Sequence, residues 1–361
     1  MAVGFPTKVD YATGDVLSAT NMNDLSGTVN LLESAQYAAG KNKIINGDFG
    51  VNQYGLNATG VAYSTGAVID RWIPAISGAT GVASLQPFTL GAAPVAGYEG
   101  TSFFRMATSV GNDFCRATTR IESVRTFANT TVTLSFWAKG TNPTTLGRLN
   151  VSLQQFFGTG GSPSSAVTSA EQNLVLTANW TRYSYTFVVP SISGKTLGTN
   201  NNDYLSVDIG QLANASTESW TLDLWGVQLE AGSTASPFQT ATGTKQGELA
   251  ACQRYYYRNT APGTYAQLGG SGPASTTSII YMAYNAPVPL RVTPTSVDYG
   301  GDLRAYDGVN YITVTSVATS GGINNNPTLQ VNSAAGFTTL RPYFLSAQAT
   351  GNAYIGFSAE L

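Results

Sequence analysis

The sequence predicts a mainly β protein, and three observations support this fold class. Charged residues make up 11% of the 361-residue chain, against about a quarter in an average soluble domain. Gly (39) and Tyr (19) are abundant, which suits short strands joined by tight turns. The stretches 131–139, 180–190 and 220–229 alternate apolar and polar residues or carry short apolar runs, as strands do. Many short strands at regular spacing predict a two-sheet sandwich.

We expect the chain to be organised as five successive segments. The first is polar and extended, the second is helical, and the third is a long region of strands with Gly-rich and Asn-rich loops. A polar linker with helical propensity then leads to a second β region, whose last strand pattern runs to the final residue. The predicted bounds are 1–20, 21–42, 43–242, 243–257 and 258–361.

The segment 21–42 carries the one clear helical period of the chain. Six residues spaced three and four apart form one stripe along a helix of about five turns. The stripe packs either on the chain's own downstream domain or against the same helix of identical chains. Its narrow width favours a parallel helical bundle, and a polar seam residue such as Gln36 often sets register and chain number. The seam residues are Met22, Leu25, Val29, Leu32, Gln36 and Ala39.

Composition argues against several classes of function. The chain has no histidine, which removes the commonest general base and the commonest metal ligand. The net charge is −2 with scattered Lys and Arg, so there is no basic surface for nucleic acid. No apolar run approaches the roughly 20 residues that cross a bilayer, and the N-terminus lacks the apolar centre of a secretory signal. We therefore expect cytoplasmic synthesis, no membrane insertion, and reduced thiols at Cys115 and Cys252.

Acidic residues provide the only candidates for catalysis, because depolymerases that cleave polysaccharide use paired carboxylates. None of the pairs has a supporting motif, and the chain lacks the repeat pattern of a β-solenoid. We therefore expect that the protein is not an enzyme. The pairs and groups considered are Asp203 with Asp208, Glu218 with Asp223, and Asp298 with Asp302 and Asp307.

Aromatic residues are the candidates for glycan recognition, because sugars stack on exposed rings. Tyr265, Tyr299 and Tyr306 lie in predicted loops of the second β region, where small polar residues add adaptable hydrogen bonding. Trp72 is a further receptor-binding candidate, whereas Trp137 and Trp225 lie within apolar alternation and are predicted to be core residues. The alternative for the loops 261–277, 298–310 and 320–326 is that they are plain solvent-exposed turns.

Short motifs along nearly the whole chain resemble bacteriophage tail-fibre and minor tail proteins. The segment 10–25 is similar to virion-attachment segments that precede a trimeric helical bundle, and Y-I-G-F-S-A-E-L at 354–361 resembles the end of the same family. The other motifs are N-K-I-I-N-G-D-F at 42–49, D-R-W at 70–72, W-G-V-Q-L-E-A-G-S at 225–233, S-P-F at 236–238 and E-L-A-A-C-Q-R-Y-Y at 248–256.

This resemblance implies a structural and adhesive virion fibre, a tail fibre or spike that binds host-surface glycan. It implies a homotrimer attached to other virion proteins through residues 1–20, with a receptor-binding tip domain at 258–361. The alternatives are a head fibre or capsid decoration protein without its own receptor, and a glycan depolymerase spike.

The middle region also resembles carbohydrate-binding modules with a jelly-roll fold, whose first and last strands pair. The motifs N-G-D-F and V-Q-L-E-A-G would lie on those strands. Related modules hold a structural Ca²⁺ through oxygen ligands there, and Asp48 and Asp223 match the positions. Gly50 stands where related modules often carry a further acidic residue. We expect no cofactor other than this ion.

Overall fold

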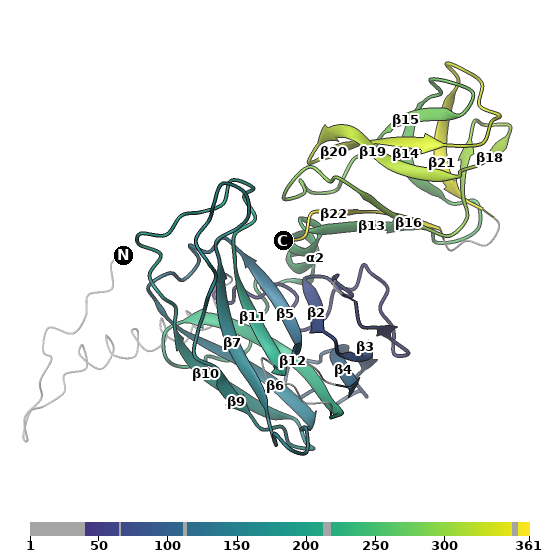
Figure 1. Ribbon diagram of the computed structural model, residues 1–361. Helices are drawn as coiled ribbons and strands as arrows, with labels where there is room; N and C mark the ends of the chain where they lie inside the picture. The colour runs from purple at the N-terminus through teal and green to yellow at the C-terminus, as the bar shows by residue number, and fades with distance from the viewer. Residues whose placement is uncertain (1–39, 65, 111–113, 212–217, 349–352) are drawn as a thin grey trace, which may run out of the picture.

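The computed structural model describes residues 40–64, 66–110, 114–211, 218–348 and 353–361 (Figure 1). The predicted segment 1–20 and the six seam residues of the helical segment lie outside this part of the chain. Within it, strands dominate and α2 (Lys245–Gln253) is an α-helix in the predicted linker. A mainly β fold is therefore confirmed. No helix in these ranges is long and apolar enough to cross a membrane.

The first half of the described chain folds into two antiparallel sheets. The chain passes between the sheets repeatedly, as in a jelly roll. The first sheet has the order β1-β3-β4-β12-β6-β10 and consists of β1 (Val61–Ala62), β3 (Thr80–Pro87), β4 (Ser102–Val110), β12 (Trp220–Ala231), β6 (Thr131–Thr141) and β10 (Thr181–Val188). The second has the order β2-β5-β11-β7-β8, with β9 also on β7, and consists of β2 (Trp72–Ser77), β5 (Phe114–Glu122), β11 (Tyr204–Gln211), β7 (Leu149–Phe156), β8 (Val167–Thr168) and β9 (Gln172–Leu174).

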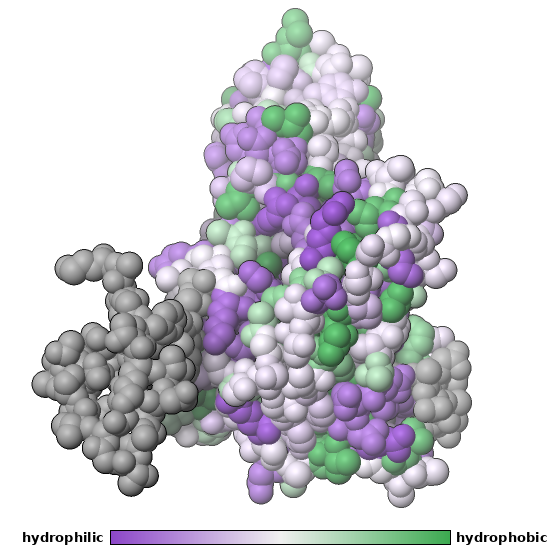
Figure 2. Space-filling view, turned by 90° about the vertical axis from the view of Figure 1, so that its left-hand side faces the viewer, coloured by the Kyte–Doolittle hydropathy of each residue, from purple (hydrophilic) through white to green (hydrophobic). Residues whose placement is uncertain are grey.

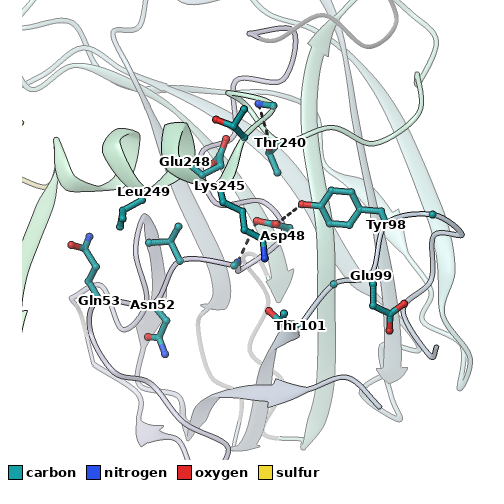
Figure 3. A pocket seen from close by; sticks show the side chains of 16 residues that line it. Asp48, Asn52, Gln53, Tyr98, Glu99, Thr101, Thr240, Lys245, Glu248 and Leu249 are labelled. Carbon is teal, nitrogen blue, oxygen red and sulfur yellow. Dashed lines mark hydrogen bonds between the residues drawn. The ribbon is translucent and has the colours of Figure 1, made fainter. Parts of the chain in front are cut away.

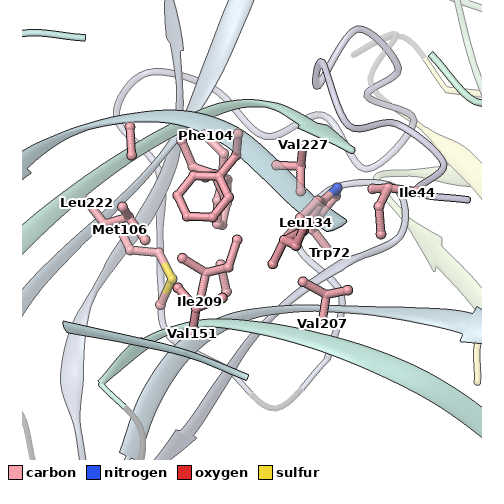
Figure 4. Packing of buried hydrophobic residues seen from close by; sticks show 14 of the residues in the cluster. Ile44, Trp72, Phe104, Met106, Leu134, Val151, Val207, Ile209, Leu222 and Val227 are labelled. Atoms are coloured by element: carbon pink, nitrogen blue, oxygen red, sulfur yellow. The ribbon is translucent and has the colours of Figure 1, made fainter. Parts of the chain in front are cut away.

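One hydrophobic core fills the space between these sheets (Figure 4). Phe104 and Leu134 come from the first sheet, and Val151 and Val207 come from the second. Period-2 alternation turns every second side chain of a strand inward. In β12 a bulge at Gly226, whose φ is +64°, shifts the phase of this alternation, so that Leu222 and Leu224 before it and Val227 and Leu229 after it all lie in the core. The central region is thus a β-sandwich.

The second β region has a separate core, shared by two more antiparallel sheets. Residues from both sheets pack together in it, among them Leu268, Leu345 and Ile355. The smaller sheet has the order β13-β22-β16 and consists of β13 (Tyr256–Thr260), β22 (Tyr354–Ser358) and β16 (Val297–Gly300). The larger has the order β18-β17-β21-β14-β15-β20-β19 and consists of β18 (Tyr311–Thr313), β17 (Leu303–Tyr306), β21 (Pro342–Ala347), β14 (Gln267–Pro273), β15 (Ile279–Ala283), β20 (Asn326–Asn332) and β19 (Ser316–Ile323).

The two regions are joined by charged and aromatic contacts beside α2. Arg254 donates to both carboxylate oxygens of Glu122 at 2.9 and 3.0 Å, and the Tyr255 hydroxyl donates to the same carboxylate at 2.8 Å. The guanidinium of Arg71 lies 3.5 Å from the centre of the Tyr255 ring and pairs with Glu360. The end of the chain is thereby bound to the sandwich.

A buried carboxylate, Asp70, lies close to this junction. Its oxygens accept hydrogen bonds from the backbone amide of Gln53 at 2.6 Å and from the side-chain amide at 2.5 Å. The Gln53 side chain also donates to the Tyr256 carbonyl across the junction at 2.6 Å. Burial outweighs these bonds and raises the pKa of Asp70 from 3.8 to about 6.

This raised pKa predicts a pH-dependent stability. A group with a higher pKa in the folded state contributes fully below its unfolded pKa and loses that contribution as the pH rises through the folded value. The contribution of Asp70 should therefore fall between about pH 4 and pH 6. Relative to Asp70→Asn, which does not titrate, wild type should lose on the order of 2 kcal/mol between pH 4 and pH 7 in urea unfolding. A difference that stays constant with pH would contradict this.

Candidate functional site

Three of the motifs that resemble phage tail proteins, N-G-D-F, D-R-W and E-L-A-A-C, come together at one buried residue, Asn46. Its side-chain amide donates to the Val51 and Asp70 carbonyls at 2.8 and 3.0 Å, and its side-chain oxygen accepts from the Val51 amide at 2.9 Å. Its backbone amide donates to Glu248 at 2.9 Å, and its carbonyl accepts from the Trp72 indole at 3.1 Å. N-G-D-F, D-R-W and E-L-A-A-C therefore meet in one structural network of hydrogen bonds.

The prediction that Trp72 binds a receptor is wrong. The Trp72 side chain is 0% exposed, and its ring lies 5.1 Å from that of Phe49. Its one polar atom is used by the Asn46 carbonyl. The ring therefore fills the sandwich core at the start of β2 and cannot meet a sugar. Trp225 is fully buried, as predicted, while Trp137 is only partly buried against the first core.

The two carboxylates proposed to bind calcium have other partners. Both oxygens of Asp223 accept from the Arg105 guanidinium, at 2.6 and 2.7 Å. Asp48 accepts from the Tyr98 hydroxyl at 2.6 Å. Calcium takes six to eight oxygen ligands, and the described ranges contain no group of three His, Cys, Asp or Glu residues able to hold a metal. These residues as arranged do not fit a Ca²⁺ ion.

The acidic residues considered for catalysis also have structural partners. Asp208 is buried, accepts a hydrogen bond from Thr118 at 2.7 Å and forms an ion pair with Arg116 at 3.2 Å. Asp203 accepts from the Val124 amide at 2.8 Å, and Asp298 accepts from the Tyr256 hydroxyl at 2.5 Å. These hydrogen bonds stabilise the strands and turns in which the carboxylates lie, and this structural role accounts for the acidic residues.

Three tyrosine rings gather at the β17–β18 hairpin of the second β region. Tyr306 and Tyr311 are cross-strand partners, and their rings stack at 4.3 Å with 17° between the planes. The Tyr265 ring lies 5.3 Å from that of Tyr311. Tyr265 is 50% exposed and Tyr311 is 38% exposed. We call Tyr265, Tyr306 and Tyr311 the tyrosine cluster.

Polar groups lie beside the tyrosine cluster in the turn that connects its strands. Asp307 accepts from the Val309 and Asn310 amides at 2.9 and 2.7 Å and pairs with Arg341 at 2.9 Å. The Asn310 amide is the main reason that the pKa of Asp307 lies below its ordinary value. No hydrogen bond joins the hydroxyls of Tyr265 and Tyr311 to other described residues. The cluster thus combines aromatic rings, two hydroxyls without partners among the described residues, and the Asp307–Arg341 ion pair.

The structure brings together two of the three predicted tyrosines and adds a third. Tyr299 lies on β16 of the smaller sheet, opposite Ile355, and is separate from the cluster. Tyr311 was not among the predicted site residues. The Asp307-Gly308 pair signals a turn at this point, but a two-residue turn would pair Tyr306 with Val309, whereas the structure has a four-residue loop that pairs Tyr306 with Tyr311.

The wider surface is mixed in hydropathy. On the described residues of the face seen in Figure 2, hydrophobic residues form small patches separated by polar ones. Large continuous apolar patches usually mark protein or membrane docking surfaces, and this face presents none among those residues. A ligand there would meet small apolar patches with polar neighbours.

Comparison with known proteins gives only distant structural similarity. No protein-family model and no curated protein matches the chain. The N-terminal cellulose-binding domain of β-1,4-glucanase C from Cellulomonas fimi is 17% identical over 38% of this chain and 84% of that domain, with a TM-score of 0.28. A family 22 carbohydrate-binding module from Clostridium thermocellum is 14% identical over 53% of this chain and 99% of the module, with a TM-score of 0.29.

A third similar structure is the enzymatically active domain of tailspike protein 4 of bacteriophage CBA120. The match is 12% identical over 53% of this chain and 22% of the chain in that structure, with a TM-score of 0.30. TM-scores of this size carry no functional argument. The evidence for function therefore comes from the chain's own residues.

Proposed function

We propose that this protein is a non-enzymatic adhesin that binds glycan through the tyrosine cluster. The observation that carries the proposal is the exposure of Tyr265 and Tyr311 beside the stacked ring of Tyr306, next to the polar turn that contains Asp307 and Asn310. Aromatic faces pack on the C–H face of a sugar ring, and adjacent polar groups satisfy its hydroxyls. No bond in the ligand needs to be broken for this function.

The proposal extends to the setting in which the adhesin works, a homotrimeric fibre or spike on a tailed-phage virion. The motif resemblance at 10–25, 42–49 and 225–256 supports it. Linked sites in three chains can raise avidity by about 10² to 10⁴ without new contacts when all engage at once. Weak stacking contacts would then suffice for attachment to a cell.

The tyrosine cluster can be tested with a closely matched control. Tyr311→Ala should weaken glycan binding about five-fold per site, because one stacking contact is worth ~1 kcal/mol. Tyr299→Ala removes a ring that is equally exposed, at 38%, on another sheet of the same domain. Binding to a glycan array and to host cells should fall for the first variant only. Equal glycan affinities of the two variants would exclude the tyrosine cluster as the binding site. If wild type bound no glycan on the array, the alternative of a decoration protein without its own receptor would be favoured.

Absence of glycan cleavage is a separate expectation. Incubation with host-surface polysaccharide should leave its chain length unchanged, because the acidic residues considered above hold structural hydrogen bonds. Release of new reducing ends, measured over time, tests this directly. Shortened chains made by wild type and not by a variant lacking Asp203, Asp208 and Asp223 would establish the depolymerase alternative.

The trimer is tested through the seam predicted from the sequence. Leu25→Asp with Leu32→Asp places charges in the seam and should reduce the sedimenting species from trimer to monomer. Asn30→Asp with Ser34→Asp adds the same charge to the opposite side of the same helix and should leave the trimer intact. Sedimentation of wild type as a monomer at micromolar concentration would refute a trimer.

A further inference from the structure

A pocket of about 670 Å³ opens between three segments that lie far apart in the sequence (Figure 3). These segments are 48–53, 97–101 and 240–249, the last including the first turns of α2. Ligand pockets in proteins typically measure about 300–1,000 Å³. The pocket is on the sandwich side of the chain and contains none of the tyrosine cluster, so it is a separate surface.

Two carboxylates in the wall of this pocket are held in place. Asp48 accepts from the Tyr98 hydroxyl at 2.6 Å (Figure 3). Glu248 accepts from the Asn46 and Thr242 amides at 2.9 and 2.8 Å and is buried, which raises its pKa. Because both carboxylates accept hydrogen bonds from other residues of the protein, they are oriented before any ligand arrives. Such preorganisation lowers the entropic cost of binding.

Other groups of the pocket are free to meet a ligand. No hydrogen bond or ion pair occupies the Lys245 amine within the described ranges, and this side chain extends toward Asp48 in Figure 3. Glu99 uses one oxygen, which accepts from the Gly91 amide at 2.7 Å. Leu249 is 39% exposed and adds an apolar surface. Acceptors, a donor and an apolar contact together match a polyhydroxylated ligand.

The balance of charge narrows the class of ligand. Asp48, Glu99 and Glu248 provide three carboxylates against the single Lys245 amine. A ligand with negative charge would face like charges at short range in a partly desolvated pocket, which is unfavourable. A neutral ligand escapes this penalty, and an amine-bearing ligand gains from the same charges.

We propose that this pocket is a second binding site, which takes a neutral or amine-bearing saccharide and rejects acidic ones. The choice of a saccharide rests on the proposed function, whereas the location of the site rests on the pocket alone. The chain would then bind glycan at two places of different character, an exposed set of rings and an acidic pocket.

The test uses the full chain carrying Tyr311→Ala, so that binding at the tyrosine cluster is reduced. Tetrasaccharides of glucose, galactose, mannose, glucosamine and glucuronic acid are titrated by calorimetry. At least one neutral or amine-bearing probe should bind, and the glucuronic acid probe should bind at least ten-fold more weakly. Leu249→Arg fills the pocket mouth and should lower affinity at least ten-fold. Gln246→Arg adds the same side chain to the same helix outside the pocket lining and should have no effect.

A second variant, Glu99→Gln, tests the pocket with a change too small to prevent folding. Glu99→Gln preserves size and should weaken the glucosamine probe more than a neutral one, since it removes one charge. Thermal unfolding of each variant is measured in parallel. Equal affinities for Leu249→Arg and Gln246→Arg, preferential binding of glucuronic acid, or no binding of any probe would overturn the pocket proposal. Loss of array binding with Tyr311→Ala bears only on the tyrosine cluster, so the two proposals fail separately.

Discussion

The hydrogen bonds of Asn46 are the constraint on which the rest of the structure depends. A buried amide must find partners, because leaving one unsatisfied costs about 1–3 kcal/mol. The Asn46 side chain bonds to Val51 in the following loop and to Asp70 just before β2. Its backbone amide donates to Glu248 on the helix α2. The adjacent Gly47 is equally constrained, since a Cβ there would lie 2.2 Å from the Val227 carbonyl oxygen of β12. One turn thus ties the beginning, middle and end of the sandwich together.

This network continues into the junction with the second β region. Glu248 lies on α2, and a few residues later Arg254 and Tyr255 bind Glu122 at the end of β5. From the other side, Arg291 donates to the Ala359 carbonyl at 2.9 Å and to the Asn201 carbonyl at 3.0 Å. Because several arginines bridge the two regions, the second region is held in a defined orientation relative to the sandwich.

The two proposed binding surfaces differ in physical character. The tyrosine cluster is open, and its affinity would come from stacking and from linkage of several weak sites. The pocket is concave and charged, and its selectivity would come from rejecting acidic ligands. A chain with both surfaces could hold one polymer at two points, or could bind two different sugars. Their separate locations make these alternatives distinguishable by substitution.

The sequence by itself determined the fold class, the two β regions with a helical connection, and the apolar faces of the main strands, because period-2 patterns act locally. The pairing of Tyr306 with Tyr311, in contrast, became known only from the structure. Only the tertiary structure decided that Trp72 is buried and that Asp223 forms an ion pair with Arg105. It also decided that Tyr265 lies in the tyrosine cluster while Tyr299 does not. It alone assembled the pocket from three distant segments. Exposure and partnership depend on contacts between residues remote in the chain, and no local pattern encodes them.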